Sequence, residues 1–285
     1  MIPVSVIVMT RNEALNIVPC LEALSRFDQI FVVDSDSNDG TPEISAGLGA
    51  TVVSFQWNGK YPKKKQWCLE NLPFRNRWVL YCDADERVTP ELADEIGLLM
   101  SSGPELAGYF IHGQPEFAGK RHRYGAWNRK LALLDRHRAC FPAFPDLDIA
   151  TMWEVEGHYQ PELQGAAGRL AGQLAGQLKY PMIHEEAASL HAWFDRHNRY
   201  SDWEAALLTD GRHSDLSSRE KGLRRLLKRV FAGLPGRPLA AFLHSYLLRL
   251  GFLDGMPGFD RAMARAFYYW QIGAKLRAHR RGPSR

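Results

Sequence analysis

The chain has 285 residues, of which 45% are hydrophobic and 24% are charged, and its net charge is +4. This length supplies a core for one large α/β domain with an appendage or for two small domains, and the composition excludes a disordered chain, a fibre and a disulfide-rich mini-protein. Residues 211–285 carry 16 Lys and Arg against 4 Asp and Glu, a net charge of +12, whereas residues 1–210 have a net charge of −8.

Apolar runs and helical patterns alternate through the first hundred residues. The pattern predicts strands at 4–9, 29–33, 50–55 and 78–82, and helices at 14–24, from Pro42, at 65–72 and from Thr89. Such alternation is typical of a mostly parallel sheet with right-handed crossovers. Residues 1–10 lack a basic segment before the apolar run, so we interpret them as a strand and not as a signal peptide. No apolar run reaches 18 residues, so we expect no transmembrane helix.

The rest of the chain is less regular and then helical. Short strands are predicted at 108–112 and 131–135, a loop at 211–218, apolar stretches at 223–234 and 239–250, and a last helix at about 259–279. The cysteines are scattered without a CxxC pair, which indicates reduced thiols in a cytosolic protein and no structural zinc site; they are Cys20, Cys68, Cys82 and Cys140.

Polar clusters directly follow three of the predicted strands. They are residues 10–13, residues 34–41 and the Asp83-Ala84-Asp85 sequence. In open α/β sheets this edge is where ligands bind. Two carboxylates one residue apart on such a turn can converge on Mg²⁺ or Mn²⁺, which commonly bridge protein carboxylates to substrate phosphates. The loop at 34–41 can hold a base or ribose, and it can form turns and a helix cap; both can hold together, with Asp39 or Thr41 as the cap and Asp34 or Asp36 facing a ligand.

Two phosphate-binding motifs are absent from the sequence. There is no GxGxxG after the first strand and no GxxxxGK[ST], which counts against a dinucleotide oxidoreductase and a P-loop NTPase.

Several segments together resemble a known family. VSVIVMTRNE (4–13), VVDSDSNDGT (32–41) and WVLYCDADERVTPEL (78–92) are similar to the family 2 glycosyltransferases, which have the GT-A fold. PKKKQW (62–67), RHNRY (196–200) and residues 237–259 resemble the lipopolysaccharide-core glucosyltransferase-like branch. The resemblance implies an α/β GT-A domain, Rossmann-like with a mostly parallel central sheet, at residues 1–210, and a basic amphipathic helical extension at 211–285.

The resemblance also implies roles for individual residues. A nucleotide sugar would be bound by Thr10, Arg11, Asn12, Glu13, Asp34, Asp36, Lys65, Asp83, Ala84, Arg196 and Arg199. Mg²⁺ or Mn²⁺ would be held by Asp83 and Asp85, with His184 as a late ligand unless that histidine is structural.

The reaction implied is transfer of a hexose with inversion to a hydroxyl group of a lipopolysaccharide, glycolipid or other cell-envelope glycan. An acceptor hydroxyl has a pKa far above 7, so a carboxylate must take its proton. We predict Glu154 as this base, with Glu156 as its rival. Two alternatives stay open: a polyprenyl-phosphate sugar transferase, which needs no strong base, and a non-catalytic module that binds nucleotide sugars.

The basic C-terminal region indicates the partners. Residues 223–231 combine Arg224, Arg225, Lys228 and Arg229 with leucines, a pattern typical of a helix at a membrane interface. The alternative is that its apolar face packs on the catalytic domain. No nucleic-acid-binding motif is present, so we expect no nucleic-acid partner. We expect a donor that is a nucleoside-diphosphate sugar, with UDP favoured, a lipid-linked or lipopolysaccharide-type acceptor, and peripheral attachment to the cytoplasmic face of the bacterial inner membrane.

Overall fold

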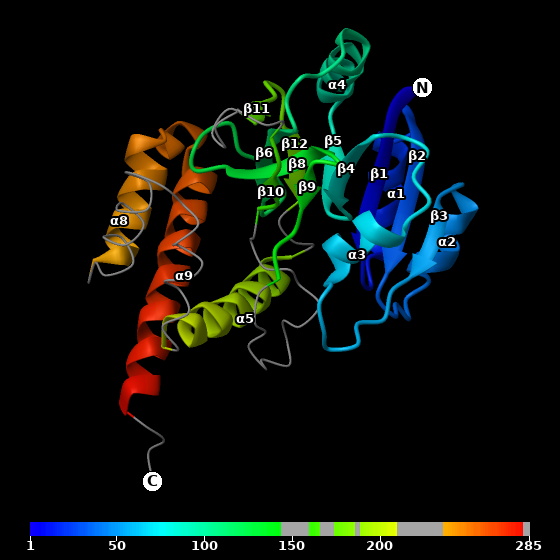
Figure 1. Ribbon diagram of the computed structural model, residues 1–285. Helices are drawn as coiled ribbons and strands as arrows, with labels where there is room; N and C mark the ends of the chain where they lie inside the picture. The colour runs from blue at the N-terminus through cyan, green and yellow to red at the C-terminus, as the bar shows by residue number, and fades with distance from the viewer. Residues whose placement is uncertain (144–159, 166–173, 186–188, 210–235, 282–285) are drawn as a thin grey trace. The chain divides into compact units, whose positions relative to one another are not determined.

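The computed structural model describes residues 1–143, 160–165, 174–185, 189–209 and 236–281 (Figure 1). The described residues group into two compact units. The first contains residues 1–115, 127–143, 160–165 and 174–185, and the second contains residues 116–126, 189–209 and 236–281.

Parallel strands form one half of the sheet of the first unit. β1 (Ile2–Thr10) lies between β2 (Phe27–Asp34) and β4 (Trp78–Asp83), and β3 (Thr51–Ser54) pairs with the far side of β2. Most of β1 is buried, as expected for a continuous apolar run that is covered on both faces. These strands confirm the four predicted at the start of the chain.

Helices connect the parallel strands. They are α1 (Ala14–Ala23), α2 (Thr41–Gly47), α3 (Lys64–Asn71) and, after the fourth strand, α4 (Pro90–Ser102). The start of α4 follows the predicted signal, because the Thr89 side chain accepts a hydrogen bond from the Leu92 N–H and proline occupies the first helical position.

Mostly antiparallel strands form the other half of the sheet, where β11 is the strand that pairs in parallel with β6 among those described. Among the described strands the order is β3-β2-β1-β4-β8-β6-β12-β5, with β11 and β7 also paired to β6. Here β5 spans Glu86–Val88, β6 Gly108–Phe117, β7 Lys120–Arg121, β8 Asn128–Asp135, β11 Ala175–Gln177 and β12 Met182–Glu185. A separate small ladder joins β9 (Ala139–Cys140) to β10 (Glu162–Leu163). β6 and β8 confirm and lengthen the two strands predicted in this region.

The core of the first unit has a layer on each face of the sheet. Successive side chains of a strand point to opposite faces, and β1 shows this: Val6 and Val8 belong to one cluster of buried side chains, and Ile7 belongs to the other. The two layers hold the strand ends of the parallel half in fixed positions.

The second unit is mainly helical. It contains α5 (Leu190–Thr209), α8 (Arg237–Leu243), the π-helix η2 (His244–Leu248), the 3-10 helix η3 (Gly251–Asp254) and α9 (Met256–Arg281). Figure 1 shows α8 alongside α9. These helices confirm the predictions at 239–250 and 259–279. The loop predicted at 211–218 and the stretch at 223–234 lie outside the described residues.

A half-buried carboxylate connects the helices of the second unit. Glu204 on α5 accepts hydrogen bonds from Arg237 on α8, at 2.9 Å, and from the Tyr268 hydroxyl on α9, also at 2.9 Å. Compactness therefore groups α5 with the C-terminal helices, which differs from the predicted division at residue 210. That division stays a prediction about domain roles.

Candidate functional site

The carboxyl ends of β1, β2 and β4 meet at one edge of the sheet. Thr10 of β1 is paired with Asp34 of β2, and Met9 is paired with Asp83 of β4. The parallel register thus brings Thr10, Asp34 and Asp83 together, although 73 residues separate the first from the last. This is the edge at which α/β sheets bind their ligands.

Asp34 is buried and is engaged within the loops that surround it. Its Oδ1 accepts hydrogen bonds from the Thr10 hydroxyl at 2.9 Å and the Ser37 hydroxyl at 2.5 Å, and its Oδ2 accepts one from the Ser37 N–H at 2.9 Å. Asp36 is exposed and has a left-handed backbone conformation, with φ of 53°. Of the two predicted aspartates, Asp36 is the one whose carboxylate faces solvent.

The loop after β1 is fastened to the loop after β2. The Asn12 N–H donates to the Ser37 hydroxyl at 2.7 Å, and the Glu13 N–H donates to the Thr41 hydroxyl at 2.9 Å. Arg11, which precedes Asn12, is exposed. The structure therefore brings the predicted residues of both loops into one platform.

A buried lysine of α3 supports this platform. The Lys64 ammonium donates to the Thr10 carbonyl at 3.1 Å and to the Ser35 hydroxyl at 2.8 Å. Lys65, the predicted residue, lies next to it and acts on Asp83 through its charge. The run of lysines at 63–65 gives no local signal for which of them is buried, so the role of Lys64 was missed.

The acidic turn between β4 and β5 has a fixed backbone. The Arg87 guanidinium donates to the Ala84 carbonyl at 2.7 Å and the Glu86 carbonyl at 2.9 Å, and lies 3.3 Å from the Glu185 carboxylate. The Asp85 carbonyl accepts a hydrogen bond from the Glu185 N–H at 2.9 Å. Thus the Arg87 side chain and the Glu185 N–H fix the backbone of the turn that contains Asp83 and Asp85.

Two buried thiols lie beneath the same turn. The Sγ atoms of Cys20 and Cys82 lie 3.8 and 3.5 Å from the Asp83 carbonyl oxygen. A hydrogen bond with Cys20, together with burial, raises the pKa of the Cys82 thiol well above its ordinary value. Both cysteines are free, and Cys82 is a protonated packing residue at neutral pH.

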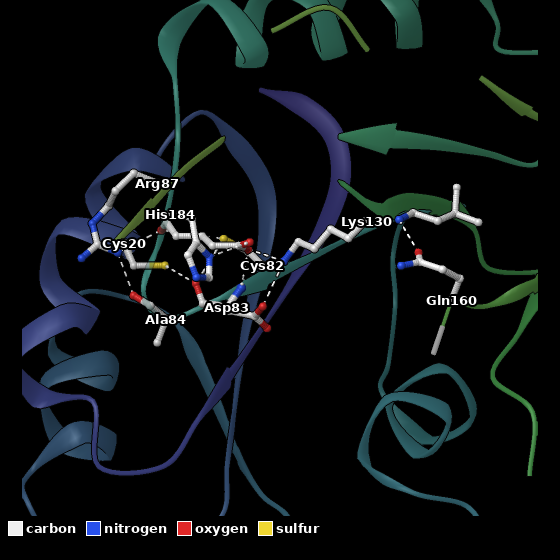
Figure 2. A network of polar contacts seen from close by, with 10 residues as sticks. Cys20, Cys82, Asp83, Ala84, Arg87, Lys130, Gln160 and His184 are labelled. Atoms are coloured by element: carbon white, nitrogen blue, oxygen red, sulfur yellow. Dashed lines mark hydrogen bonds and ion pairs between the residues drawn. The ribbon is translucent and has the colours of Figure 1, made fainter. Parts of the chain in front are cut away.

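Figure 2 shows the Lys130 side chain reaching from β8 to this turn. Its ammonium lies 3.1 Å from Asp83 Oδ2 and also forms an ion pair with Glu86 Oε2. His184 of β12 is paired with Glu86 of β5, and its Nδ1 lies 3.6 Å from Glu86 Oε1. The structure therefore brings His184 to the acidic turn, as predicted, and adds Lys130 and Glu86, which sequence reasoning missed.

The charges of this cluster stabilise one another. Burial raises the pKa of Asp83, but the positive charges of Lys130 and Lys65 outweigh burial and hold that pKa well below its usual range. Burial lowers the pKa of Lys130, but Asp83 and Glu86 outweigh it and raise that pKa above its usual value. Asp83 and Lys130 are both charged at neutral pH.

The carboxylates at the turn supply some, but not all, of the ligands that a hard divalent cation needs. Within the described ranges, no group of three or more His, Cys, Asp and Glu side chains is arranged to hold a metal ion. The Asp83 side chain is 43% exposed, so its carboxylate is accessible. Mg²⁺ is commonly held by one or two carboxylates together with substrate phosphates. The chain thus supplies oxygen ligands that fit such an ion when phosphate oxygens complete them.

The remaining predicted residues lie in the second unit or outside the described residues. Arg196 and Arg199 lie on α5 in the second unit, where Arg199 is 3.5 Å from Asp195. Glu154 and Glu156 lie outside the described residues. Gln160, which follows them, accepts a hydrogen bond from the Leu131 N–H at 2.6 Å, as Figure 2 shows. The predicted roles of these residues stay predictions.

Comparison with known proteins gives related sequences. The family model described as Glycosyl transferase family 2 matches residues 5–146. The uncharacterized glycosyltransferase RP128 of Rickettsia prowazekii is 34% identical over 282 residues, which cover 96% of this chain and 86% of that protein. The lipopolysaccharide core biosynthesis glycosyltransferase LpsC of Rhizobium meliloti is 26% identical over 285 residues, 96% of this chain and 92% of LpsC.

Other relatives match only in part. An uncharacterized glycosyltransferase of Rickettsia felis is 34% identical over 135 residues, which are 47% of this chain and 41% of that protein. The chain therefore spans about two fifths of the length of that relative.

A solved structure shows the fold. The mannosyltransferase PcManGT from Pyrobaculum calidifontis, in complex with GDP-Man and Mn²⁺, matches with a TM-score of 0.51 and 15% identity over 96% of this chain and 86% of its own. At this identity the likeness concerns the fold alone. It confirms the predicted α/β fold of the GT-A type with a helical C-terminal region.

Proposed function

Because the chain belongs to glycosyl transferase family 2, we propose that it transfers a hexose from a nucleoside-diphosphate sugar to a hydroxyl group of a lipopolysaccharide or other cell-envelope glycan. The observation that carries this proposal is the meeting of Thr10, Asp34 and Asp83 at the carboxyl edge of the parallel strands. The likeness to LpsC over nearly the whole chain supports the acceptor class.

The donor nucleotide is proposed to bind on the platform formed by the loops after β1 and β2. Asp36 supports this role because its carboxylate is exposed at the platform. Asp34 orders the platform from below through its hydrogen bonds with Thr10 and Ser37. We favour a UDP-sugar as donor. Lys65, whose charge acts on Asp83, is proposed to contact the donor's diphosphate.

A divalent cation, Mg²⁺ or Mn²⁺, is proposed to bind with the diphosphate. Asp83 and Asp85 would hold it, with His184 as a further ligand, and the accessible Asp83 carboxylate supports this assignment. Such an ion supplies Lewis-acid neutralisation of the charge that develops on a departing nucleoside diphosphate. The chain's own contribution is to keep the turn rigid through Arg87.

Deprotonation of the acceptor is proposed for Glu154, with Glu156 as the rival. A hydroxyl nucleophile needs a carboxylate to take its proton as it attacks. Only three residues separate Glu156 from Gln160, which is hydrogen-bonded to the residue next to Lys130. Arg196 and Arg199 are proposed to bind the diphosphate or the acceptor from α5, because guanidinium groups bind phosphate oxygens in a bidentate manner.

The test is a donor screen followed by base variants. UDP- and GDP-hexoses are offered to the full chain with a deacylated lipopolysaccharide core acceptor, with and without Mn²⁺ or Mg²⁺, and the released nucleoside diphosphate is measured. General-base catalysis contributes about 10²–10⁴-fold, so Glu154→Gln is expected to lower kcat by at least about 100-fold while donor binding is kept. Wild-type turnover in both Glu154→Gln and Glu156→Gln would contradict a hydroxyl acceptor with a glutamate base.

We also propose peripheral attachment to an anionic membrane at its cytoplasmic face. Within the described residues, no helix combines the length and the hydropathy that crossing a bilayer requires. The second unit exposes leucine side chains on α8, η2 and η3, close to Arg249; they are Leu239, Leu243, Leu247, Leu248, Leu250 and Leu253. Exposed apolar side chains beside basic residues are typical of a surface that inserts shallowly into a lipid interface.

This attachment is tested with vesicles that contain phosphatidylglycerol. Full insertion of a leucine side chain contributes about 1.5–3 kcal/mol, so the Leu239→Glu/Leu248→Glu variant is expected to lose sedimentation with the vesicles. Leu98→Glu, at an equally exposed leucine of α4, serves as the control. Equal sedimentation of the double variant and the wild type would contradict membrane attachment through these leucines.

A further inference from the structure

Lys130 is built into the sheet opposite the acidic turn. β8 runs antiparallel to β4, with Trp78 paired with Asp135 and Leu80 paired with Leu133. On its other side β8 pairs with β6, where Lys130 itself is paired with Ile111. Lys130 therefore lies within a paired strand, and its ammonium reaches the acidic turn from there.

A buried carboxylate holds the ammonium there. Glu86 is 1% exposed, and its Oε2 accepts a hydrogen bond from the Asp83 N–H at 2.9 Å and forms an ion pair with Lys130. If the ammonium left, this buried carboxylate would lose its positive partner, which is strongly unfavourable. Glu86 therefore keeps a positive charge within 3.1 Å of the Asp83 carboxylate.

A divalent cation that binds Asp83 meets this charge. The oxygen that Lys130 contacts, Asp83 Oδ2, belongs to the carboxylate that is most accessible at the turn. A metal ion must either displace the ammonium from that oxygen or bind the other oxygen close to an existing positive charge. Both routes weaken its affinity, and the effect is large because the groups are partly screened from water.

We propose that Lys130 is an internal counter-ion that competes with a divalent cation for the Asp83 carboxylate, so that the site without nucleotide binds such a cation weakly. This inference rests on the proposed function, in which Asp83 helps to hold the cation. It assigns Lys130 as a positioning residue: the ammonium keeps the acidic turn neutralised and ordered without any metal, and it sets the metal affinity.

The test is an equilibrium titration of the full chain with Mn²⁺ in the absence of nucleotide, with the free ion followed by electron paramagnetic resonance. Lys130→Met is expected to lower the dissociation constant for Mn²⁺ by at least about tenfold, which corresponds to about 1.4 kcal/mol. Lys120→Met, at an exposed lysine of β7, is the matched control and is expected to stay within about twofold of wild type. Equal affinities for wild type and Lys130→Met would overturn the proposal, as would a lack of Mn²⁺ uptake by both.

A second pair of variants guards against misfolding, because Lys130→Met leaves the Glu86 carboxylate buried without its partner. Glu86→Gln removes that charge and keeps an oxygen that can accept the Asp83 N–H. The comparison is then between Glu86→Gln and Glu86→Gln/Lys130→Met, with circular dichroism and thermal unfolding to verify folding. The same tenfold tightening is expected when the lysine is removed, and its absence from the folded pair would overturn the proposal.

The outcome is separate from that of the proposed function. The Mn²⁺ titration uses no donor or acceptor, whereas the donor screen measures turnover. A chain that turns over a nucleotide sugar, yet binds Mn²⁺ equally with and without Lys130, would refute the counter-ion role alone. A chain without turnover on any donor, in which Lys130→Met still tightens Mn²⁺ binding, would refute the proposed function and keep the inference.

Discussion

Replacement of Lys64 by methionine tests whether the platform after β1 and β2 depends on a buried charge. Hydrogen bonds that involve a charged group contribute about 1.5–3 kcal/mol each, and the Lys64 ammonium donates to the Thr10 carbonyl and to the Ser35 hydroxyl. The Thr10 carbonyl keeps a second donor, the Ser35 N–H at 3.1 Å, so that acceptor stays satisfied when the lysine is removed.

The expected cost follows from these contacts. The Ser35 hydroxyl is 2% exposed and loses the hydrogen bond that its oxygen accepts from Lys64, whereas methionine preserves most of the contacts of the aliphatic stem. Removing the ammonium also relieves the cost of burying it. We therefore expect Lys64→Met to lower the free energy of unfolding by about 2–3 kcal/mol, which is less than the about 3–6 kcal/mol that the hydrogen bonds to Thr10 and Ser35 would contribute together.

The assay is urea unfolding of the full chain, followed by tryptophan fluorescence, together with a titration of the donor nucleotide. Lys60→Met, at an exposed lysine shortly before α3, is the control. A weaker platform is expected to weaken nucleotide binding in Lys64→Met but not in Lys60→Met. The reasoning is refuted if the two variants unfold within about 0.5 kcal/mol of each other, the usual range for surface substitutions.

Three further predictions concern single carboxylates and their donors. Asp34→Asn is expected to lower the free energy of unfolding by about 1–3 kcal/mol in urea, because the Asp34 carboxylate accepts hydrogen bonds from the Thr10 hydroxyl and from the Ser37 hydroxyl and N–H. An unchanged urea midpoint would contradict this prediction. Folding lowers the pKa of Asp83, so the charged carboxylate stabilises the fold at pH values above its ordinary pKa of about 4, and this stabilisation is lost as the pH falls through the lower folded value. Acidification should therefore destabilise the wild type more than Asp83→Asn. A melting temperature that changes with pH equally in both proteins would contradict this prediction. Tyr268→Phe is expected to cost about 1.5–3 kcal/mol in thermal unfolding, because the Tyr268 hydroxyl donates to the charged Glu204 carboxylate at 2.9 Å. A cost near zero would show that this hydrogen bond is not stabilising.

The parallel half of the fold could be predicted from local patterns. Residues 4–9 form an apolar run followed by a polar cluster, and a run of that kind has few alternatives to a strand that is covered on both faces. Once such strands are parallel, their carboxyl ends share one edge. The meeting of Thr10, Asp34 and Asp83 was therefore predictable, although the chain separates them widely.

The charged partner of the turn could not be predicted in this way. Lys130 lies 47 residues after Asp83, and it reaches that residue because β8 lies beside β4 in the sheet. A register is set by side-chain packing across the sheet, and one residue of slip would turn every side chain of the strand to the other face. The residues around Lys130 have no periodicity that fixes the register. The buried role of Lys64 was missed for a similar reason, because the side of α3 that faces the loops depends on packing.

The acidic turn shows that burial assigns the carboxylates different roles. A pattern of two aspartates one residue apart selects Asp83 and Asp85, and it passes over Glu86. In the structure Glu86 is almost fully buried, and its carboxylate accepts the Asp83 N–H and holds the Lys130 ammonium. The Asp83 carboxylate is 43% exposed. Because an exposed carboxylate can exchange one partner for another at small cost, whereas a buried one cannot, Glu86 fixes the geometry and Asp83 is the group whose partner can change when a ligand binds.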